Sequence, residues 1–190
     1  MTTDTPLDER RRTREQTRVD ARNARSWLLI NALRDDVFDD AQLSRADQVI
    51  LDCEDAVDDS RKDEARAKVL EWFSRGGRAW VRINERGSQA WADDVRTLRD
   101  AHGLCGVMLA KTESPDQVVD TVQRLGGHLP VIPLVESALG IEDAVSIARA
   151  PGAFRLAFGS GDYRDRSTAR PSARATRCCA SSRATRSRSA

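Results

Sequence analysis

Charged and amide side chains follow the short apolar runs of this sequence, at the point where each run ends. Two of them, Glu136 and Asp162, follow consecutive runs and could approach one cation from adjacent directions. Two carboxylates, completed by waters and substrate oxygens, are typical ligands of Mg²⁺ in proteins. The wider set comprises Asp52, Glu54, Asp55, Arg82, Asn84, Lys111, Glu136 and Asp162.

The basic members of this set suit the recognition of anionic oxygen atoms. Arg82 can present a planar pair of N–H groups to a substrate carboxylate or to a developing enolate, and Lys111 offers a point charge. A Schiff-base role for Lys111 has little support, because it requires a lowered pKa that the sequence does not reveal. For any one residue, a solvated or paired surface charge is the simpler interpretation. Repetition at successive run ends favours a site with both signs of charge.

Six apolar runs have the length of buried strands, and most of the segments between them are amphipathic. The runs cover residues 27–30, 49–51, 79–83, 106–109, 131–135 and 154–158. Helices are expected over 63–75 with Ser60 as the cap, over 89–102, and from Pro115 onward, with a shorter one within 37–43. A further helix is expected after Gly140, with Ile141, Ala144, Val145 and Ala148 facing inward.

Strand followed by helix, six times over, indicates an α/β protein with a parallel sheet and right-handed crossovers. The spacing matches the units of a TIM-type (β/α)8 barrel, in which the chemistry gathers at the carboxyl ends of the strands. A complete barrel typically needs about 250 residues. This chain has 190 residues, so we expect an incomplete barrel with about six βα units. An open doubly wound sheet is the alternative, although residues 31–34 lack the Gly-rich dinucleotide turn that would favour it.

The two ends of the chain differ from the patterned region. Residues 1–24 are polar and of mixed charge, so we expect a flexible or helical extension. Residues 164–190 contain eight arginines, one acid and no Val, Leu, Ile, Met or aromatic residue, which is typical of a disordered tail. The abrupt change suggests a shifted reading frame or a degraded gene. A genuine basic tail that binds nucleic acid is the rival interpretation.

The composition argues against several classes of protein. Basic and acidic residues number 31 and 30, and the formal net charge is +1. No apolar stretch approaches the roughly 20 residues that cross a bilayer, and the first residues lack the apolar segment of a secretory signal. Four scattered cysteines do not suit a disulfide framework, which favours a reducing compartment. We therefore expect a cytoplasmic protein with no membrane partner.

Seven segments of the patterned region also resemble one known family. They include DQVILDCEDAV at 47–57, VRIN at 81–84, VMLAK at 107–111, IPLVESALG at 132–140 and AFGSGDY at 157–163, with further matches at 25–29 and at Lys62, Ala65 and Arg66. In this order they resemble the citrate lyase beta-subunit family, within the aldolase/citrate lyase superfamily of (β/α) barrels. The resemblance covers residues 25–163.

This resemblance implies a Mg²⁺-dependent carbon–carbon lyase that cleaves an acyl-CoA such as citryl-, malyl- or citramalyl-CoA through an enolate-like intermediate. It implies Glu136 and Asp162 as metal ligands, and Arg82 and Glu136 as substrate-binding residues. Arg34 would face the coenzyme phosphates. Arg82, Glu54, Asp55 and Lys111 are implied around the reacting groups. The partner is then an acyl-CoA or hydroxy acid, and the full-length family fold implies a homo-oligomer.

Departures from the family pattern leave the substrate open. Asn31-Ala32 replaces a proline-containing turn, Cys53 replaces a leucine, and Ala110 replaces a proline. After Tyr163 the two further βα units of the family are not recognisable, so the chain is expected to be truncated. Three hypotheses therefore stand: a lyase, whose activity the truncation puts in question, a non-catalytic metal- or acyl-CoA-binding remnant, and a basic-tailed nucleic-acid-binding protein, with nucleic acid the least favoured partner.

Overall fold

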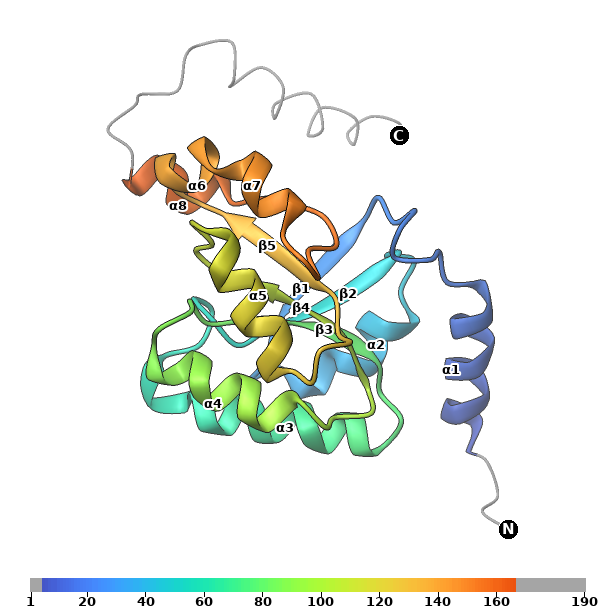
Figure 1. Ribbon diagram of the computed structural model, residues 1–190. Helices are drawn as coiled ribbons and strands as arrows, with labels where there is room; N and C mark the ends of the chain where they lie inside the picture. The colour runs from blue at the N-terminus through green and yellow to red at the C-terminus, as the bar shows by residue number, and fades with distance from the viewer. Residues whose placement is uncertain (1–4, 167–190) are drawn as a thin grey trace, which may run out of the picture.

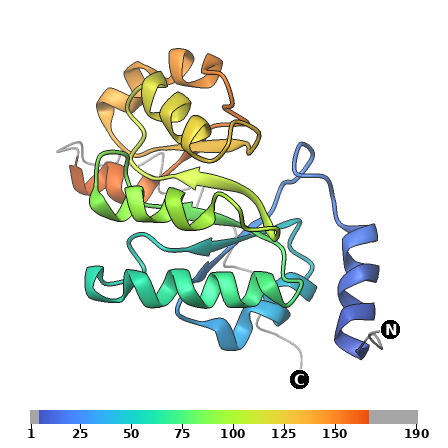
Figure 2. The same ribbon diagram turned by 60° about the horizontal axis from the view of Figure 1, so that its bottom comes forward.

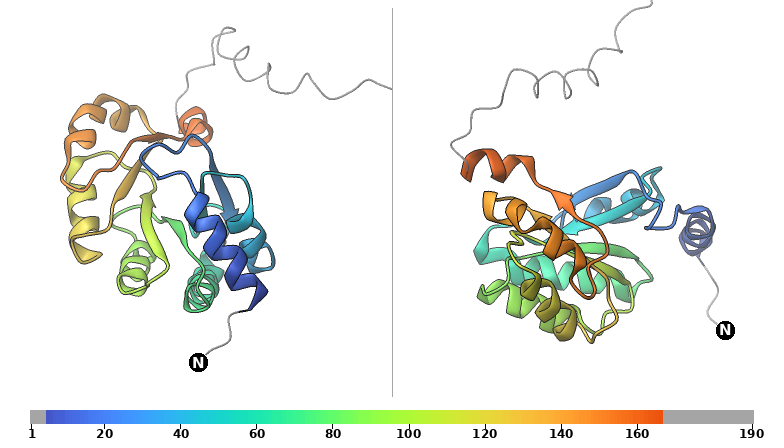
Figure 3. Two further views of the ribbon diagram at one scale, coloured as in Figure 1. Left: turned by 90° about the vertical axis from the view of Figure 1, so that its right-hand side faces the viewer. Right: turned by 45° about the horizontal axis from the view of Figure 1, so that its top comes forward.

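A single sheet of six parallel strands, in the order β1-β2-β3-β4-β5-β6, forms the centre of the protein (Figure 1). The computed structural model describes residues 5–166. The strands are β1 (Trp27–Asn31), β2 (Gln48–Asp52), β3 (Ala79–Ile83), β4 (Leu104–Leu109), β5 (Val131–Val135) and β6 (Ala157–Phe158). Neighbours in sequence are neighbours in the sheet, as in a barrel, and the sheet curls with helices on its outer side (Figure 3). The expected incomplete α/β barrel of six units is confirmed.

Eight α-helices belong to the described residues. They are α1 (Pro6–Thr17), α2 (Phe38–Leu43), α3 (Lys62–Ser74), α4 (Gln89–Leu98), α5 (Pro115–Arg124), α6 (Ala138–Glu142), α7 (Ala144–Arg149) and α8 (Ser160–Arg166). The expected start of α5 is confirmed, because Pro115 is its first residue and the Gln117 side chain accepts a hydrogen bond from the Ser114 N–H at 3.0 Å. Ser60 is not the cap of α3, because a 3₁₀ turn over Asp59–Arg61 leads directly into that helix.

The segment after Gly140 corrects one expectation. A single helix with Ile141 and Val145 facing inward was expected, but these side chains are 44% and 63% exposed. The chain instead forms α6 and α7 with a break at Asp143, and Ile147 becomes the buried residue. Likewise, α4 ends at Leu98 rather than at residue 102.

Apolar side chains fill both faces of the curled sheet. The larger cluster lies between the sheet and its helices and includes Leu51, Trp72, Leu98 and Leu109. A smaller one on the inner face is centred on Ile50, Trp80 and Ile132. Because the sheet is covered on both faces, β2 and β5 are buried along their whole length, as the continuous apolar runs predicted. Trp72, Trp80 and Trp91 are all buried in this core.

The N-terminal extension is the helix α1, which lies beside α2 (Figures 2 and 3). Its arginines bind backbone carbonyls of the barrel. Arg14 donates to Ser44 O and Ala46 O at 2.9 and 2.7 Å, and Arg11 donates to Arg75 O at 2.5 Å. Of the two alternatives expected for residues 1–24, the helical one therefore holds for Pro6–Thr17. Residues 167–190, most of the tail expected to be disordered, lie outside the described residues. Within 5–166, no helix has the length and apolarity to cross a membrane.

Candidate active site

The carboxyl ends of four neighbouring strands bring the predicted polar residues together. Asp52 is the last residue of β2, Arg82 is paired with it across the sheet in β3, and Lys111 and Glu136 follow β4 and β5. Parallel strands in sequential order end at the same edge, so side chains far apart in sequence become neighbours. Lys111 Nζ, for example, lies 2.6 Å from Glu54 Oε1.

Two carboxylates bind the Arg82 guanidinium. Its Nε and Nη2 donate to the two oxygens of Asp52 at 2.8 and 2.6 Å, and Nη1 lies 3.2 Å from Glu54 Oε2. Burial alone would lower the pKa of Arg82, but its hydrogen bonds to Asp52, together with the charges of Asp52, Glu54 and Asp55, outweigh burial and raise the pKa. Two N–H groups of the fork that was expected to face a substrate thus donate to Asp52 in this structure. A guanidinium has more N–H groups than these contacts use, so donors remain for a substrate oxygen.

Lys111 has an uncommon backbone conformation. Its φ is +50°, in the left-handed region that residues other than glycine seldom adopt. This turn directs the Lys111 N–H to Glu136 Oε2 at 3.3 Å, while Nζ reaches Glu54 at 2.6 Å and Asp55 at 3.1 Å. Burial would lower the pKa of Lys111, but the Glu54 and Asp55 carboxylates outweigh burial and raise it. The side chain is therefore an ammonium at neutral pH, which argues against a Schiff-base nucleophile.

Glu136 is a buried carboxylate beside other carboxylates. It is 3% exposed. Burial, the charge of Asp162 and the charge of Glu54 raise the pKa of Glu136 to about 7, against the smaller opposing effect of Arg82. Asp162 was expected at the end of a strand, but β6 ends at Phe158 and Asp162 lies in the first turn of α8. The residue nevertheless acts electrostatically on Glu136, as expected for two groups that share a site.

The surroundings of Glu136 fit a hard divalent cation. A Cβ added to Gly159 would lie 2.5 Å from Glu136 Oε1, so the backbone approaches the carboxylate as closely as only glycine allows. No three His, Cys, Asp or Glu side chains of residues 5–166 are grouped to hold a metal. The protein would thus supply two carboxylates, and water and substrate oxygens would supply the rest.

Arg34 does not join this group. Its guanidinium pairs with Asp36 at 2.9 Å, and both side chains are exposed. Cys53, which replaces a leucine of the family pattern, is fully buried, and burial raises the pKa of its thiol. The residue that sequence reasoning missed is Asp94, which is completely buried on α4 beneath the site. The signal was present, because Asp94 lies on the same helical stripe as Trp91, Val95 and Leu98.

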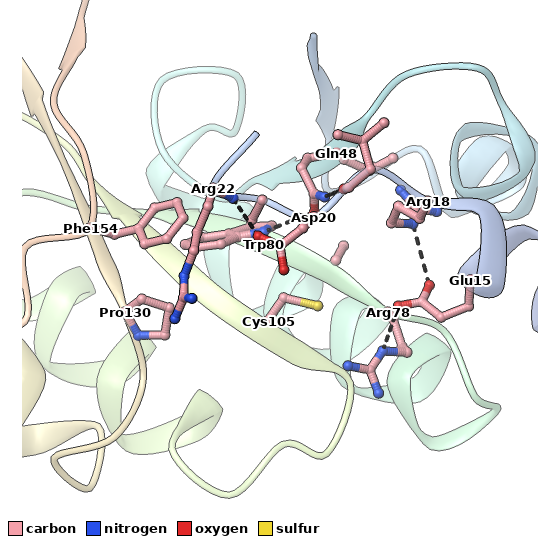
Figure 4. Close-up of a pocket in the computed structure, with 14 residues that line it drawn as sticks. Glu15, Arg18, Asp20, Arg22, Gln48, Arg78, Trp80, Cys105, Pro130 and Phe154 are labelled. Carbon is pink, nitrogen blue, oxygen red and sulfur yellow. Dashed lines mark hydrogen bonds and ion pairs between the residues drawn. The ribbon is translucent and has the colours of Figure 1, made fainter. Parts of the chain in front are cut away.

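A separate cavity of about 480 Å³ lies at the opposite, amino ends of the strands. Gln48, Ala79 and Cys105, at the starts of β2, β3 and β4, line it together with Trp80 and Phe154 (Figure 4). The Trp80 indole N–H donates to Gln48 Oε1 at 3.2 Å, and Glu15 is paired with Arg18 and Arg78. These polar groups are paired with one another, and none of the predicted site residues lines this cavity.

Comparison with known proteins identifies a family. The model of the HpcH/HpaI aldolase/citrate lyase family matches residues 25–185, and this match continues beyond residue 163, where the resemblance was expected to end. Mitochondrial citramalyl-CoA lyase of Rattus norvegicus is 33% identical over 143 residues, which cover 63% of this chain and 42% of the relative. A citrate lyase subunit beta-like protein of Mycobacterium tuberculosis (strain ATCC 25618 / H37Rv) is 36% identical over 136 residues, covering 72% of this chain and 47% of the relative.

A solved structure shares the fold. Protein CitE from Mycobacterium tuberculosis, in complex with magnesium, acetoacetate and coenzyme A, superposes with a TM-score of 0.66 at 32% sequence identity. The superposition covers 80% of this chain and 55% of that one. This chain spans about half the length of the curated relatives it matches.

Proposed function

Because this chain belongs to the HpcH/HpaI aldolase/citrate lyase family, we propose that it is a Mg²⁺-dependent carbon–carbon lyase that acts on an acyl-CoA. Citryl-, malyl- and citramalyl-CoA are the candidate substrates, and a relative from Rattus norvegicus is a citramalyl-CoA lyase. One observation supports the proposal most directly. The charges of Asp162 and Arg82 act on the buried Glu136 carboxylate. This carboxylate lies at the strand ends, where it accepts a hydrogen bond from the Lys111 N–H.

In this proposal Glu136 and Asp162 hold the Mg²⁺ ion. The raised pKa of Glu136 reflects burial and unbalanced negative charge, which a divalent cation would neutralise. When bound, the ion would supply positive charge beside the substrate oxygens on which negative charge develops as the bond breaks. The magnesium complex of CitE from Mycobacterium tuberculosis supports magnesium as the ion.

The cations of the chain itself would stabilise the same developing charge. Asp52 orients Arg82 by two hydrogen bonds, and Glu54 and Asp55 keep Lys111 protonated, so both groups act as fixed donors. Donors that are held in place before the reaction need little reorganisation when negative charge appears on an enolate-like oxygen. Arg82 therefore binds and orients the substrate, and Lys111 donates to it.

Calorimetric titration with Mg²⁺ tests the metal site. Glu136→Ala and Asp162→Ala are each expected to abolish measurable binding, because one remaining carboxylate leaves a hard cation with too few charged ligands. Asp116→Asn, which removes an exposed carboxylate of α5, is the matched control and should bind as the parent does. Parental Mg²⁺ affinity in either alanine variant would refute the assignment.

An assay of acyl-CoA cleavage tests the reaction. The Mg²⁺-loaded full chain should release acetyl-CoA from citryl-, malyl- or citramalyl-CoA, and chelation of the metal should stop the release. A chain that binds Mg²⁺, acetoacetate and coenzyme A but shows no turnover would instead be a non-catalytic binding protein. That result would disprove the lyase activity and leave the metal site intact.

A further inference from the structure

A buried network of polar side chains lies directly beneath Glu54. At its centre is the Lys62 ammonium, whose residue is 7% exposed. Nζ donates to Asn84 Oδ1 at 2.7 Å, to Glu54 O at 3.1 Å and to Cys53 O at 3.4 Å. An ammonium group has three N–H donors, so these three acceptors satisfy it.

Two further residues anchor this network. Asn84 Nδ2 donates to Cys53 O at 3.2 Å and to Asp94 Oδ2 at 2.7 Å, and the Asn84 backbone N–H donates to the same Asp94 oxygen at 2.9 Å. Arg66 Nη1 donates to Asp94 Oδ1 at 2.7 Å. Asp94 is completely buried, and the paired arginine and the amide donors offset part of the cost of burying its charge. The network therefore has one well-defined arrangement.

The network holds both ends of one loop. Cys53 and Glu54 begin the loop that follows β2, and Lys62 is the first residue of α3, where that loop ends. The same loop carries Glu54 and Asp55, whose carboxylates bind Lys111. Thus the backbone carbonyl of Glu54 is fixed from below by Lys62, and its carboxylate contacts Lys111 and Arg82 above.

The two carboxylates assigned to the metal lie outside this network. Glu136 follows β5 and Asp162 belongs to α8, whereas Lys62, Asn84 and Asp94 belong to α3, the end of β3 and α4. The site therefore has a metal side on β5 and α8, and a substrate side on the loop of residues 53–62 with Arg82 and Lys111. Lys111 touches both sides, since its backbone N–H donates to Glu136.

We propose that Lys62 and Asn84 are positioning residues that orient Glu54, and through it Arg82 and Lys111, for the substrate. This inference takes the identity of the ligand from the proposed function. The positioning of Glu54 by Lys62 and Asn84 does not depend on that function. Loss of the Lys62 ammonium frees the Glu54 carbonyl and removes a charged anchor of the loop. The Glu54 carboxylate then no longer holds Lys111 and Arg82 in one orientation. Carboxylate ligands bind more weakly, whereas Mg²⁺ binding is unchanged.

The test compares Lys62→Met with Lys68→Met. Lys68 belongs to the same helix and also makes an ion pair, with Asp35 at 2.5 Å, but it lies away from the loop. In Lys62→Met, the affinity for acetoacetate in the presence of Mg²⁺ and coenzyme A should fall by about tenfold or more, since small misplacements in a site have effects of this size. The Mg²⁺ affinity should stay within about twofold of the parent. Lys68→Met should leave both affinities unchanged.

A second measurement does not depend on the proposed function. The rate at which an acylating reagent modifies Lys111 reports whether Glu54 and Asp55 still hold its ammonium, and mass spectrometry after proteolysis gives that rate. We expect faster modification in Lys62→Met, the parental rate in Lys68→Met, and an intermediate rate in Lys62→Arg, which retains the charge. Lys62→Arg also replaces Lys62→Met if the latter does not fold.

The outcomes separate the two proposals. If the parent binds neither Mg²⁺ nor acetoacetate, the proposed function fails, and the Lys111 modification rate alone decides whether Lys62 is a positioning residue. Parental acetoacetate affinity and a parental Lys111 rate in a folded Lys62 variant would overturn the inference. An equal loss of Mg²⁺ and acetoacetate binding would also overturn it, because this result indicates general destabilisation.

Discussion

At the scale of single residues, the site depends on charges that burial forces into pairs. Glu136 has no basic side chain bonded to it within the described residues, and burial together with Asp162 and Glu54 raises its pKa to about 7. Arg82 and Lys111 show the opposite behaviour, because bound carboxylates hold them in the charged form. The unpaired negative charge of Glu136 therefore lies where the metal is proposed. The paired, fixed positive charges of Arg82 and Lys111 lie beside it.

The raised pKa of Glu136 predicts a pH dependence of stability. Between its ordinary value of 4.5 and about 7, the folded protein retains a proton on Glu136 that the unfolded chain releases. Without divalent cations, the free energy of unfolding should therefore fall across this range by about 3 kcal/mol as the pH rises. Urea denaturation at several pH values measures it. Glu136→Gln should lose this part of the slope, and an unchanged slope in that variant would contradict the assignment.

Arg82→Lys tests the need for a planar donor. Asp52 binds Arg82 through two parallel hydrogen bonds, which a lysine ammonium does not reproduce. We expect the variant to fold but to bind acetoacetate at least about tenfold more weakly, as expected for the loss of an oriented charged donor. Calorimetry in the presence of Mg²⁺ gives the affinity. An affinity equal to that of the parent would exclude Arg82 from the substrate site.

At the scale of elements, α1 is attached to the barrel mainly by arginines rather than by an apolar stripe. Arg11 is the most buried of them, and it joins α1 to Arg75 at the end of α3 and to Asp39 of α2. The Asp39 carboxylate also accepts a hydrogen bond from Trp72 Nε1 at 2.7 Å. One carboxylate thus links α1, α2 and α3.

Arg11→Ala should detach α1 while leaving the barrel folded. The change removes hydrogen bonds of a buried charged group, each of which contributes about 1.5–3 kcal/mol, so α1 should be cleaved by trypsin or another protease much faster than in the parent. Arg10→Ala, an exposed residue on the same helix, is the control and should keep the parental rate. If the two variants are cleaved at equal rates, Arg11 does not anchor the helix.

At the scale of the whole molecule, the sheet of residues 5–166 has two edges. Strands β1 and β6 each pair with one neighbour, and the large apolar side chains Leu29 and Phe158 on these strands are 45% and 55% exposed. A complete barrel has no edges, and its interior is filled by side chains from all strands. An open parallel sheet with exposed apolar residues on its edges favours association with other chains.

We therefore expect the chain to self-associate as its concentration rises. Sedimentation velocity over a range of concentrations should show species larger than the monomer. Replacing both edge residues, Leu29→Lys and Phe158→Ser, should shift the distribution towards monomer, because charge on an edge opposes strand pairing. A parent that stays monomeric at all concentrations would show that the edges do not promote association.

The sequence by itself determined the architecture and the location of the site. Six apolar runs and the Pro115 helix start indicate parallel βα units, and parallel strands in sequential order necessarily end at one edge. The polar residues that follow those runs must therefore meet. This local pattern is enough to predict that Asp52, Arg82, Lys111 and Glu136 are neighbours, without any knowledge of their contacts.

Only the tertiary structure decided which of these groups bind one another. Arg82 donates to Asp52, Lys111 adopts a positive φ, and Asp94 is buried beneath the site. All three depend on how segments far apart in the chain pack together. Burial determines which groups bind one another, because a charge removed from water is costly unless a neighbouring group pairs with it. A one-dimensional pattern records where charges occur, but their partners and pKa values follow from the packing that encloses them.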